Sequence, residues 1–458
     1  MATGYRTHDH NGTPNPLAAL SDEQLAEIGR EFDQLHEEVK ADLGDRDARY
    51  IRGIIALQRR LALMGRIELL AARWRPLWWL GMSTLSTAKI LENMEIGHNV
   101  MHGQWDWMND PVINSQVWDW DTASTKEAWK HSHNFIHHTY TNILGKDRDL
   151  GYEIMRIDPH QPWHPVYLLQ PLYNILLMIL FEWGVAVHDL DFTAIRAGQK
   201  DIKQVRKELK GIAGKARLQI QKDYVAWPLL SAAVSAGVRA GVRAIVRGRR
   251  RRGGARGVRG RLIRRLRGAS DGAAAEPARI LADFRAAYLA TLKADAWANV
   301  VRNVWSNAII FCGHFPDQTY VFTQEEVRDE TPGGRYVRQL IGAANINGSP
   351  LFHVLSGNLG YQVEHHLYPD MPSSRYGEIA PRVREICKRH GLPYNTGPFF
   401  KQWGSVQRSI LRLAFPGGRP RPKPGPWTGE TFISQGEREL AVAAEAARAA
   451  ERAQAAHP

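Results

Sequence analysis

Apolar residues gather in four stretches of the chain that have the length or the composition of membrane-spanning helices. The stretch 165–187 carries no charge before Glu182 and is long enough to cross the hydrocarbon core, which takes about 20 residues of helix. Residues 75–103 form another such stretch, and 224–242 and 296–313 form two weaker ones. The pattern predicts a helical protein with several membrane spans, although the number of spans stays open.

The stretch 75–103 predicts a helix of mixed character. It begins with Trp78 and Trp79, and tryptophans commonly anchor helices at a membrane interface. It also carries Lys89, Glu92 and Glu95, whose charges are costly in lipid and should therefore face protein. We predict one long helix that leaves the membrane with two histidines at its end.

The rest of the chain divides around this apolar part. Residues 1–74 are predicted to form a polar arm and an amphipathic helix, whose segment 51–71 is basic on one face and aliphatic on the other. This pattern suits a helix that lies at a bilayer surface, and a helix packed on the soluble part is the equal alternative. Residues 75–416 are predicted as the membrane domain with an inserted arginine-rich loop at about 243–278, and 417–458 as a solvent-exposed tail.

The formal net charge of +13 could indicate a nucleic-acid partner, but the excess is local. Residues 243–267 alone hold about a dozen arginines, so we expect no nucleic-acid partner. The positive-inside rule predicts instead that this loop lies in the cytoplasm, beside anionic lipid headgroups. With only two cysteines, Cys312 and Cys387, the chain has neither a disulfide scaffold nor a cysteine-based zinc site.

Three short motifs, which we call the histidine boxes, carry the candidate chemistry. They read HNVMH at 98–102, HNFIHH at 133–138 and QVEHH at 362–366. Residues four apart share one face of a helix, so each of the first two boxes can point a pair of imidazoles in one direction. Neutral imidazole is the commonest protein ligand for first-row transition metals, and a structural zinc site takes only four ligands. Seven imidazoles therefore favour a pair of irons that handle dioxygen.

Other residues near the boxes extend the candidate site. His314 ends an apolar stretch, as the boxes do, and is predicted to be a further ligand. His188 is a possible ligand or supporting group, with a capping role as the alternative, and His131 is a weaker candidate because it lies two positions before His133. Ligating imidazoles need hydrogen-bond acceptors behind them. The candidates for that role, or for holding a metal-bound water, are Gln362, Asp106, Asn142, Asp147, Asp149 and Glu364.

On these motifs the chain resembles the membrane-bound fatty acid desaturases, an integral-membrane family with a non-haem di-iron centre. The resemblance covers roughly residues 75–400 and rests on GHNVMHGQW, WKHSHNFIHHTYTN and GYQVEHHLYPDMP around the boxes. It implies that two irons are bound by His98, His102, His133, His137, His138, His365 and His366. His314 matches the extra histidine that the family supplies near its last span, and Gln362 replaces the first histidine of the third box, as in one large branch.

The resemblance implies a fatty acid desaturase that introduces a cis double bond into an acyl-CoA or an acyl-lipid, with O2 as co-substrate and two electrons. The HPGG motif of a fused cytochrome b5 domain does not occur, so the electrons should come from a separate ferredoxin, cytochrome b5 or flavoprotein reductase. A membrane fatty acyl or sterol hydroxylase with the same kind of di-iron centre is the alternative. A histidine-rich membrane protein that binds or transports metal is a distant one.

The predicted fold is all-α: a multi-pass transmembrane helical bundle whose cytoplasmic cap carries the histidine boxes. Each box lies beside an apolar stretch, so all three can gather on one face of the membrane. This requires that an even number of spans, or a re-entrant stretch, separates the second box from the third.

Overall fold

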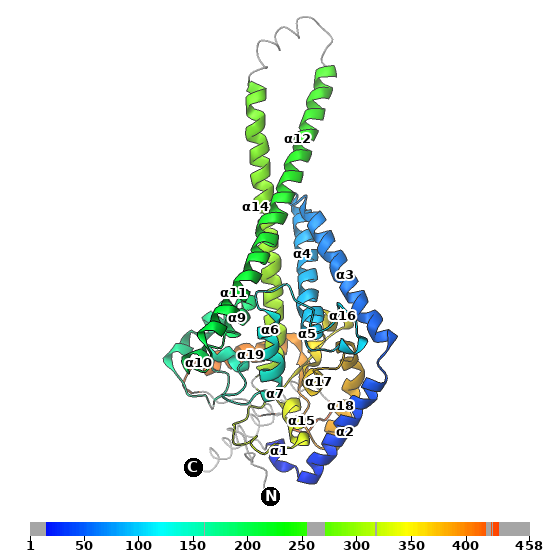
Figure 1. The fold of residues 1–458 in the computed structure, drawn as a ribbon, viewed down its shortest axis with the longest axis vertical. Helices are drawn as coiled ribbons and strands as arrows, with labels where there is room; N and C mark the ends of the chain where they lie inside the picture. Colours follow the sequence, from blue (N-terminus) through cyan, green and yellow to red (C-terminus); the bar gives the residue numbers. More distant parts are fainter. Residues whose placement is uncertain are drawn as a thin grey trace, which may run out of the picture.

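The computed structural model describes residues 15–159, 161–253, 271–316, 318–417, 423 and 425–429, and these are almost entirely helical. The helices form two parts, a broad cap and a narrow stalk that projects from it (Figure 1). Among the described residues the strands are β1 (Asn345–Asn347) and β2 (Thr396–Pro398), which pair in parallel within the cap. The predicted all-α class is confirmed.

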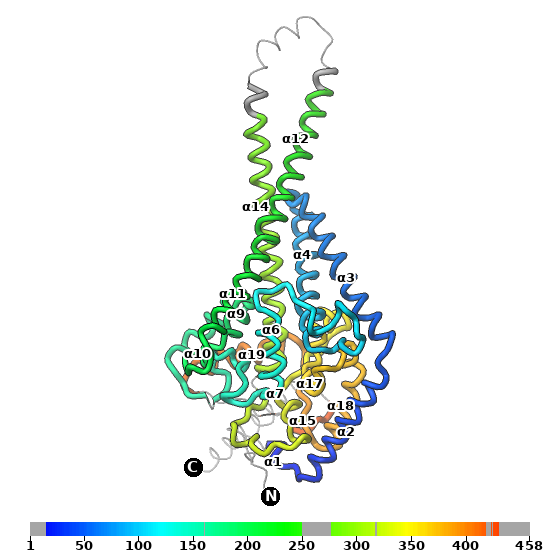
Figure 2. The backbone as a smooth tube through the Cα atoms, in the orientation of Figure 1, coloured from blue at the N-terminus to red at the C-terminus, as the bar shows by residue number. Residues whose placement is uncertain are grey.

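Four long helices make the stalk. In chain order they are α3 (Asp45–Leu69), α4 (Arg75–Leu91), α12 (Trp227–Gly253) and α14 (Asp271–His314). The helices α3 and α12 lead away from the cap, and α4 and α14 return to it (Figure 2). The helix α11 (Ile202–Gln219) and the π-helix η6 (Ile220–Ala226) run directly into α12.

Helix α3 contains the amphipathic segment 51–71, and it packs along α4. A Cβ on Gly65 would lie 2.9 Å from the backbone nitrogen of Leu85, and a Cβ on Gly81 would lie 2.8 Å from Leu69 Cγ. The two glycines therefore allow the helices to approach closely. The boundary predicted between residues 74 and 75 falls inside this helical hairpin.

The long helix predicted for 75–103 is confirmed. Helix α4 continues without a break into the π-helix η1 (Glu92–His98) and α5 (Asn99–Met101). The charges along it face protein, as expected: Lys89 donates to Asp223 at 2.7 Å, and Glu95 is fully buried. This helix delivers the first histidine box to the cap.

The crossing helix predicted for 165–187 is wrong. The segment forms η5 (Pro165–Leu169), α8 (Gln170–Ile179) and α9 (Phe181–His188), because Leu180 leaves the helical conformation at φ −107° and ψ 27°. Beyond the break, the Glu182 carboxylate pairs with Arg302 of α14 and accepts hydrogen bonds from Gln219 at 3.0 and 3.1 Å. A buried carboxylate has to meet such partners, so a tertiary contact that hydropathy cannot show redirects the chain.

Within the described part of the chain, one helical stretch is long and apolar enough to cross a membrane. It is Ile202–Arg249, which contains the predicted span 224–242, and Pro165–Ile179 is apolar but shorter. The predicted span 296–313 forms the cap-proximal end of α14. Hydropathy alone therefore does not establish a multi-pass bundle.

The stalk carries its charges between its helices and its apolar side chains outside. Arg66 of α3 donates to Asp223 at 2.6 Å and pairs with Asp295 of α14, and Lys89 of α4 reaches the same Asp223. Large apolar side chains that are more than 40% exposed cover the outer faces. They include Leu63, Met64, Ile67, Trp79, Leu80, Leu229, Leu230, Val238, Leu281 and Trp297.

The cap joins distant parts of the chain. Its longer helices are α2 (Asp22–Ala41), α15 (Pro332–Ile341), α18 (Tyr376–Arg389) and α19 (Phe399–Leu413). Its shorter helices are α1 (Pro16–Ala19), η2 (Asp106–Met108), α6 (Lys126–Trp129), η3 (Lys130–His137), α7 (His138–Tyr140), η4 (Leu150–Glu153), α10 (Phe192–Arg196), α16 (Pro350–Leu355), η7 (Leu359–Tyr361), α17 (Gln362–Leu367) and η8 (Ser373–Arg375). Phe32 of α2 packs with Val337 of α15 and Tyr368 in the largest buried cluster, so the N-terminal arm is part of the cap.

Most of the predicted tail lies outside the described residues, but the Trp427 backbone donates to the Leu392 carbonyl at 2.9 Å, so this part packs on the cap.

The arginine-rich insert and the histidine boxes lie at opposite ends of the molecule. Helix α12 ends at Gly253 and α14 begins at Asp271, both at the end of the stalk that is far from the cap (Figure 1). Residues 254–270 lie outside the described residues. A membrane crossed by the stalk would separate the insert from the boxes, so the predictions of a cytoplasmic insert and of cytoplasmic boxes exclude each other.

Candidate metal centre

Six helical segments bring the predicted ligands together where the stalk meets the cap. The π-helix η1 and α5 carry the first box, η3 and α7 carry the second, α17 carries the third, and His314 is the last residue of α14. Two of these segments, η1 and η3, are π-helices, and such wide turns recur at functional sites because they change the direction of side chains. The structure thus gathers all eight histidines of the sequence prediction.

Seven of these imidazoles form two groups whose nitrogen atoms lie within 4.8 Å of one another. The first group is His98, His102, His133 and His365, and the second is His137, His314 and His366. The ring of His138 lies between them, with centroid distances of 4.7 Å to His102 and 4.7 Å to His366. This arrangement offers two adjacent metal positions.

Hydrogen bonds fix the tautomers in the first group. The His98 Nδ1–H donates to Asn99 Oδ1 at 3.1 Å, and the His133 Nδ1–H donates to Asp149 Oδ2 at 3.0 Å. Each ring then carries a lone pair on Nε2, and the two Nε2 atoms face each other at 3.4 Å. Two facing lone pairs repel unless a cation lies near both, so the geometry suits a metal ion between them.

The second group repeats the pattern. The His137 Nδ1–H donates to Asp147 Oδ1 and the His366 Nδ1–H donates to Gln339 Oε1, both at 3.0 Å. The Nε2 atom of His366 lies 3.4 Å from Nε2 of His314, and the buried Nε2 of His137 has no protein partner. Acceptors on the outer nitrogens therefore direct the inner nitrogens toward a common point.

Burial keeps most of these rings neutral. It lowers the pKa of His98 to about 3 and holds the pKa values of His102, His138, His365 and His366 well below the usual range, with the neighbouring imidazoles adding to the effect. Burial alone would also lower the pKa of His137, but attraction to Asp147 raises it instead. A neutral ring offers the lone pair that a metal needs, so the set can bind metal at pH 7.

Buried carboxylates surround the imidazoles without matching cations. Glu95, Asp147, Asp189 and Glu364 are at most 6% exposed, and within the described part of the chain none forms an ion pair with lysine or arginine. Burial raises the pKa of Asp189 and that of Glu364, since their charged forms are costly there. A buried charge of this kind demands compensation. A pair of metal dications would supply it, and imidazole is a suitable donor for iron, so the residues fit two irons.

Three of the predicted supporting residues lie where expected. Asp147 and Asp149 accept hydrogen bonds from the second box, and His188 contacts Asp149 at 3.1 Å, one step behind His133. The Gln362 amide lies 3.1 Å from His314 Nε2, with its Oε1 buried and unpartnered. A Cβ on Gly313 would come within 2.8 Å of the Gln362 side chain, so a glycine there makes room for it.

Other predicted supporting residues have different partners. Asp106 binds Ser115 through its backbone nitrogen and its hydroxyl, at 2.7 and 2.6 Å. Asn142 donates to the carbonyls of Tyr320 and Gly342, and Glu364 accepts from Tyr394 and Asn345, so neither directly supports a box histidine. His131 is exposed and stacks on Phe135. Sequence proximity to a box therefore does not fix the direction of a side chain.

Sequence reasoning missed several supporting residues. Besides Asn99 and Gln339, these include Tyr376, whose hydroxyl lies 3.1 Å from His365 Nδ1, and Asp189, which accepts from Ser132, the residue before the second box. Tyr376 lies 11 residues after His365 and Gln339 lies 27 residues before His366, and no local motif marks either residue. Asn99 lies inside the first box, where its position could have drawn notice.

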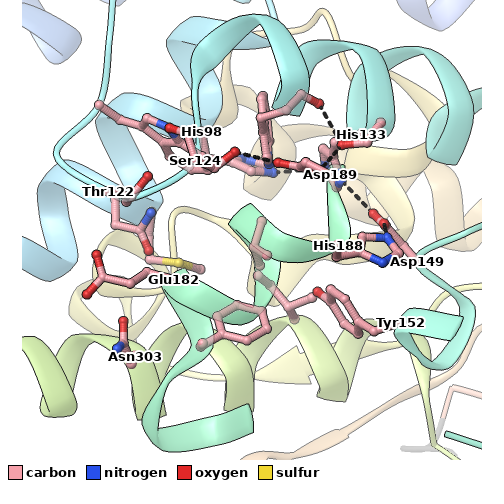
Figure 3. A pocket seen from close by; sticks show the side chains of 18 residues that line it. His98, Thr122, Ser124, His133, Asp149, Tyr152, Glu182, His188, Asp189 and Asn303 are labelled. Carbon is pink, nitrogen blue, oxygen red and sulfur yellow. Dashed lines mark hydrogen bonds and ion pairs between the residues drawn. The ribbon is translucent and has the colours of Figure 1, made fainter. Parts of the chain in front are cut away.

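A largely apolar pocket adjoins the first imidazole group. It has a cavity volume of about 60 Å³ and is lined by His98, His133, Trp120, Trp129, Phe181 and Val185 among others. Figure 3 shows His98 and His133 along one side of the pocket, with Glu182 and Asn303 at the end away from His133. An apolar pocket that meets a metal centre can hold a hydrocarbon chain against it.

Comparisons with known proteins agree with this geometry. The family model for fatty acid desaturases matches residues 73–246 and 220–398. The NADPH-dependent stearoyl-CoA 9-desaturase of Mycobacterium tuberculosis is 43% identical over 400 residues, which covers 87% of this chain and 82% of the relative.

More distant relatives match only a short part of the chain. Human fatty acid desaturase 3 is 39% identical over 74 residues, 16% of this chain and 17% of its own. The acyl-lipid (9-3)-desaturase of Borago officinalis is 37% identical over 79 residues, 17% of this chain and 18% of its own. No solved structure matches the chain. The family model and the mycobacterial relative both span most of the sequence, and the chain therefore belongs to the fatty acid desaturase family.

Proposed function

We propose that the chain introduces a cis double bond at carbon 9 of a saturated acyl-CoA, with stearoyl-CoA as the preferred substrate. The position and the carrier follow the name of the mycobacterial relative, which is similar over most of both chains. The observation that supports the chemistry is the convergence of inward-facing imidazole lone pairs in two adjacent groups. A desaturation of this kind converts two methylenes, O2, two electrons and two protons into an alkene and two waters.

The eight histidines would hold two irons, with the four rings of the first group on one iron, the three of the second on the other, and His138 between the two. The metal pair would supply O2 activation and hydrogen removal, which side chains cannot perform alone. The chain's own residues set the conditions. Asp147, Asp149, Gln339 and Tyr376 orient the rings, and the pocket walls exclude water from the acyl chain.

The electrons would reach the centre from a separate protein. The relative's name indicates NADPH as their source, and the chain carries no HPGG motif of a fused cytochrome b5 domain. An NADPH-linked flavoprotein, alone or with a ferredoxin, is the donor we propose. The two irons, O2 and the donor are the complete set of cofactors and co-substrates that we expect.

Expression in a desaturase-deficient host tests the function. We expect oleate to appear at the expense of stearate, two mass units below the saturated acid, with the double bond located at carbon 9 by derivatisation and mass spectrometry. A vector without insert is the control. A product sixteen mass units above the saturated acid would identify a hydroxylase, and an unchanged profile with donor present would reject both activities.

We further propose that the stalk crosses the membrane and that the cap faces the cytoplasm, where acyl-CoA and NADPH occur. Apolar side chains are exposed on all four stalk helices, whereas the ion pairs around Asp223 are buried between them. This distribution is the reverse of that of a water-soluble bundle, because lipid, unlike water, contacts apolar surface at no cost. The same topology puts the arginine-rich insert on the other side of the membrane.

Cysteine labelling tests the topology. Glu37→Cys lies on an exposed position of α2 in the cap, and Gly248→Cys lies near the far end of α12 with no neighbour within 4 Å. The two native cysteines are buried, so they should react little. We expect a membrane-impermeant maleimide to label Gly248→Cys in intact spheroplasts and Glu37→Cys only in inverted vesicles. Labelling of both from one side would refute the proposed crossing.

A further inference from the structure

Glu95 is a buried carboxylate that the proposed reaction does not use directly. It is fully buried in η1, one turn before His98. Its Oε1 accepts hydrogen bonds from the Tyr50 hydroxyl and the Ser373 hydroxyl, both at 2.8 Å, and its Oε2 accepts one from Asn358 Nδ2 at 3.0 Å. Burial raises the pKa of Glu95 to about 7 although these donors lower it, so the carboxyl is only partly ionised at neutral pH unless a nearby cation favours the charged form.

This negative charge has no cationic partner in the protein. Within the described part of the chain, no lysine or arginine forms an ion pair with Glu95. Asp223 shows the contrast, since its equally buried carboxylate meets Arg66 at 2.6 Å and Lys89 at 2.7 Å. Neutral donors stabilise a buried charge but do not cancel it, so the compensation for Glu95 has to come from another source.

The residue next to His98 links Glu95 to the metal centre. The Nδ2 group of Asn99 donates to the Glu95 carbonyl and to the Gly357 carbonyl, each at 3.1 Å, and lies 3.4 Å from Glu95 Oε2. These bonds turn the Asn99 amide so that its Oδ1 faces His98 Nδ1 at 3.1 Å. The inner nitrogen of His98 is thereby left free for a metal.

We propose that Glu95 is a positioning residue for the metal centre: its charge compensates the two dications, and its contact with Asn99 fixes the orientation of His98. This inference rests on the proposed function, because it needs a metal pair beside His98. Asp149 orients His133 by a direct hydrogen bond, and Glu95 would orient His98 in the same way through the Asn99 amide. The effect is expected on metal binding and on the reduction potential before it is seen in turnover.

The test compares Glu95→Gln, which keeps the shape and removes the charge, with Tyr50→Phe, which keeps the charge and removes one donor. Iron retention is measured by chelator competition and the midpoint potential by anaerobic titration of the purified full-length protein. We expect Glu95→Gln to bind iron about 10- to 100-fold more weakly and to show a more positive potential, since the ferric state loses more stabilisation. Tyr50→Phe is expected to lose less iron affinity than Glu95→Gln, because it removes one donor that lowers the pKa of Glu95 but keeps the carboxyl that the metal pair can hold ionised.

Thermal stability distinguishes a carboxylate that compensates the metal charge from a side chain that only stabilises the fold. If the charge of Glu95 is compensated only by bound metal, metal-free Glu95→Gln should have a melting temperature equal to or above that of the metal-free wild type. Iron-loaded Glu95→Gln should melt below the iron-loaded wild type. A variant that is less stable or unfolded without metal, or that has an unchanged affinity and potential, would overturn the inference. A wild type that retains no iron would instead reject the proposed function itself.

Discussion

Replacing His365 with alanine is expected to lower the iron content from two per chain to one or less and to abolish desaturation. His365 lies in the first imidazole group, with its ring 4.8 Å from His102 and 5.1 Å from His98, and its buried Nε2 has no protein partner. Removal of a direct ligand should exceed the 10- to 100-fold loss that is typical of residues that only orient a ligand, so we expect a drop of more than roughly 100-fold. Iron analysis and fatty acid profiles of the same preparation measure both effects.

His131→Ala is the matched control. His131 precedes the second box by two residues but is exposed and stacks on Phe135, so iron content and activity should match the wild type. Both variants should reach the membrane in similar amounts, because the stalk does not depend on either ring. Full activity in His365→Ala would remove this residue from the metal centre and contradict the two-group arrangement.

Asp147→Asn is expected to reduce iron affinity and turnover about 10- to 100-fold, the range typical of a residue that orients a ligand. The Asp147 carboxylate accepts from His137 Nδ1 at 3.0 Å and from the Asn142 backbone at 2.8 Å. An asparagine in its place can present its NH2 to His137, which favours the tautomer with the proton on Nε2 and blocks the metal-binding lone pair. The raised pKa of His137, which Asp147 causes against the effect of burial, should fall in the variant.

The direction of the pH effect on iron binding follows from the raised pKa of His137. In the wild type, a proton on His137 competes with metal below its raised pKa, so iron binding should weaken as the pH falls through that value. In Asp147→Asn the competition should begin at a lower pH although the affinity at neutral pH is reduced. Measurement of the iron dissociation constant between pH 5.5 and 8 tests this shift.

Asp106→Asn is the control for Asp147→Asn, since Asp106 also follows a histidine box but binds Ser115. Its effect should be limited to a small loss of stability, with iron affinity within about twofold of the wild type, because the hydrogen bonds it makes are local. Equal losses in both variants would show that a general change of the loops, and not the orientation of His137, is responsible.

The two imidazole groups hold four and three rings, and Gln362 lies beside the smaller group. Gln362 opens the third box and lies beside His314 in the group that holds three rings. Its buried amide oxygen lacks a protein partner, so the side chain can hold a water or a weak ligand there. Gly313 leaves space for this side chain and belongs to the same helix as His314.

The sequence was sufficient to locate the candidate histidines, because imidazole pairs at helical spacing are a local pattern. The eight histidines, the helix that carries His98 and the all-α class could all be read from spacing and hydropathy. Asp147 and Asp149 were also within reach, since they follow the second box closely and point back to it across one short turn. Local geometry decides each of these features.

Only the tertiary structure decided how the boxes meet and what surrounds them. The grouping into four and three rings and the surroundings of Glu95 depend on segments that are hundreds of residues apart, and the supporting roles of Gln339 and Tyr376 depend on how their helices pack against the third box. The break at Leu180 adjoins the Glu182–Arg302 pair and contradicts the single helix that the hydropathy of 165–187 predicts. The physical reason is that buried charges select partners by position in space, and a linear pattern of apolar residues holds no information about which distant side chain will face them.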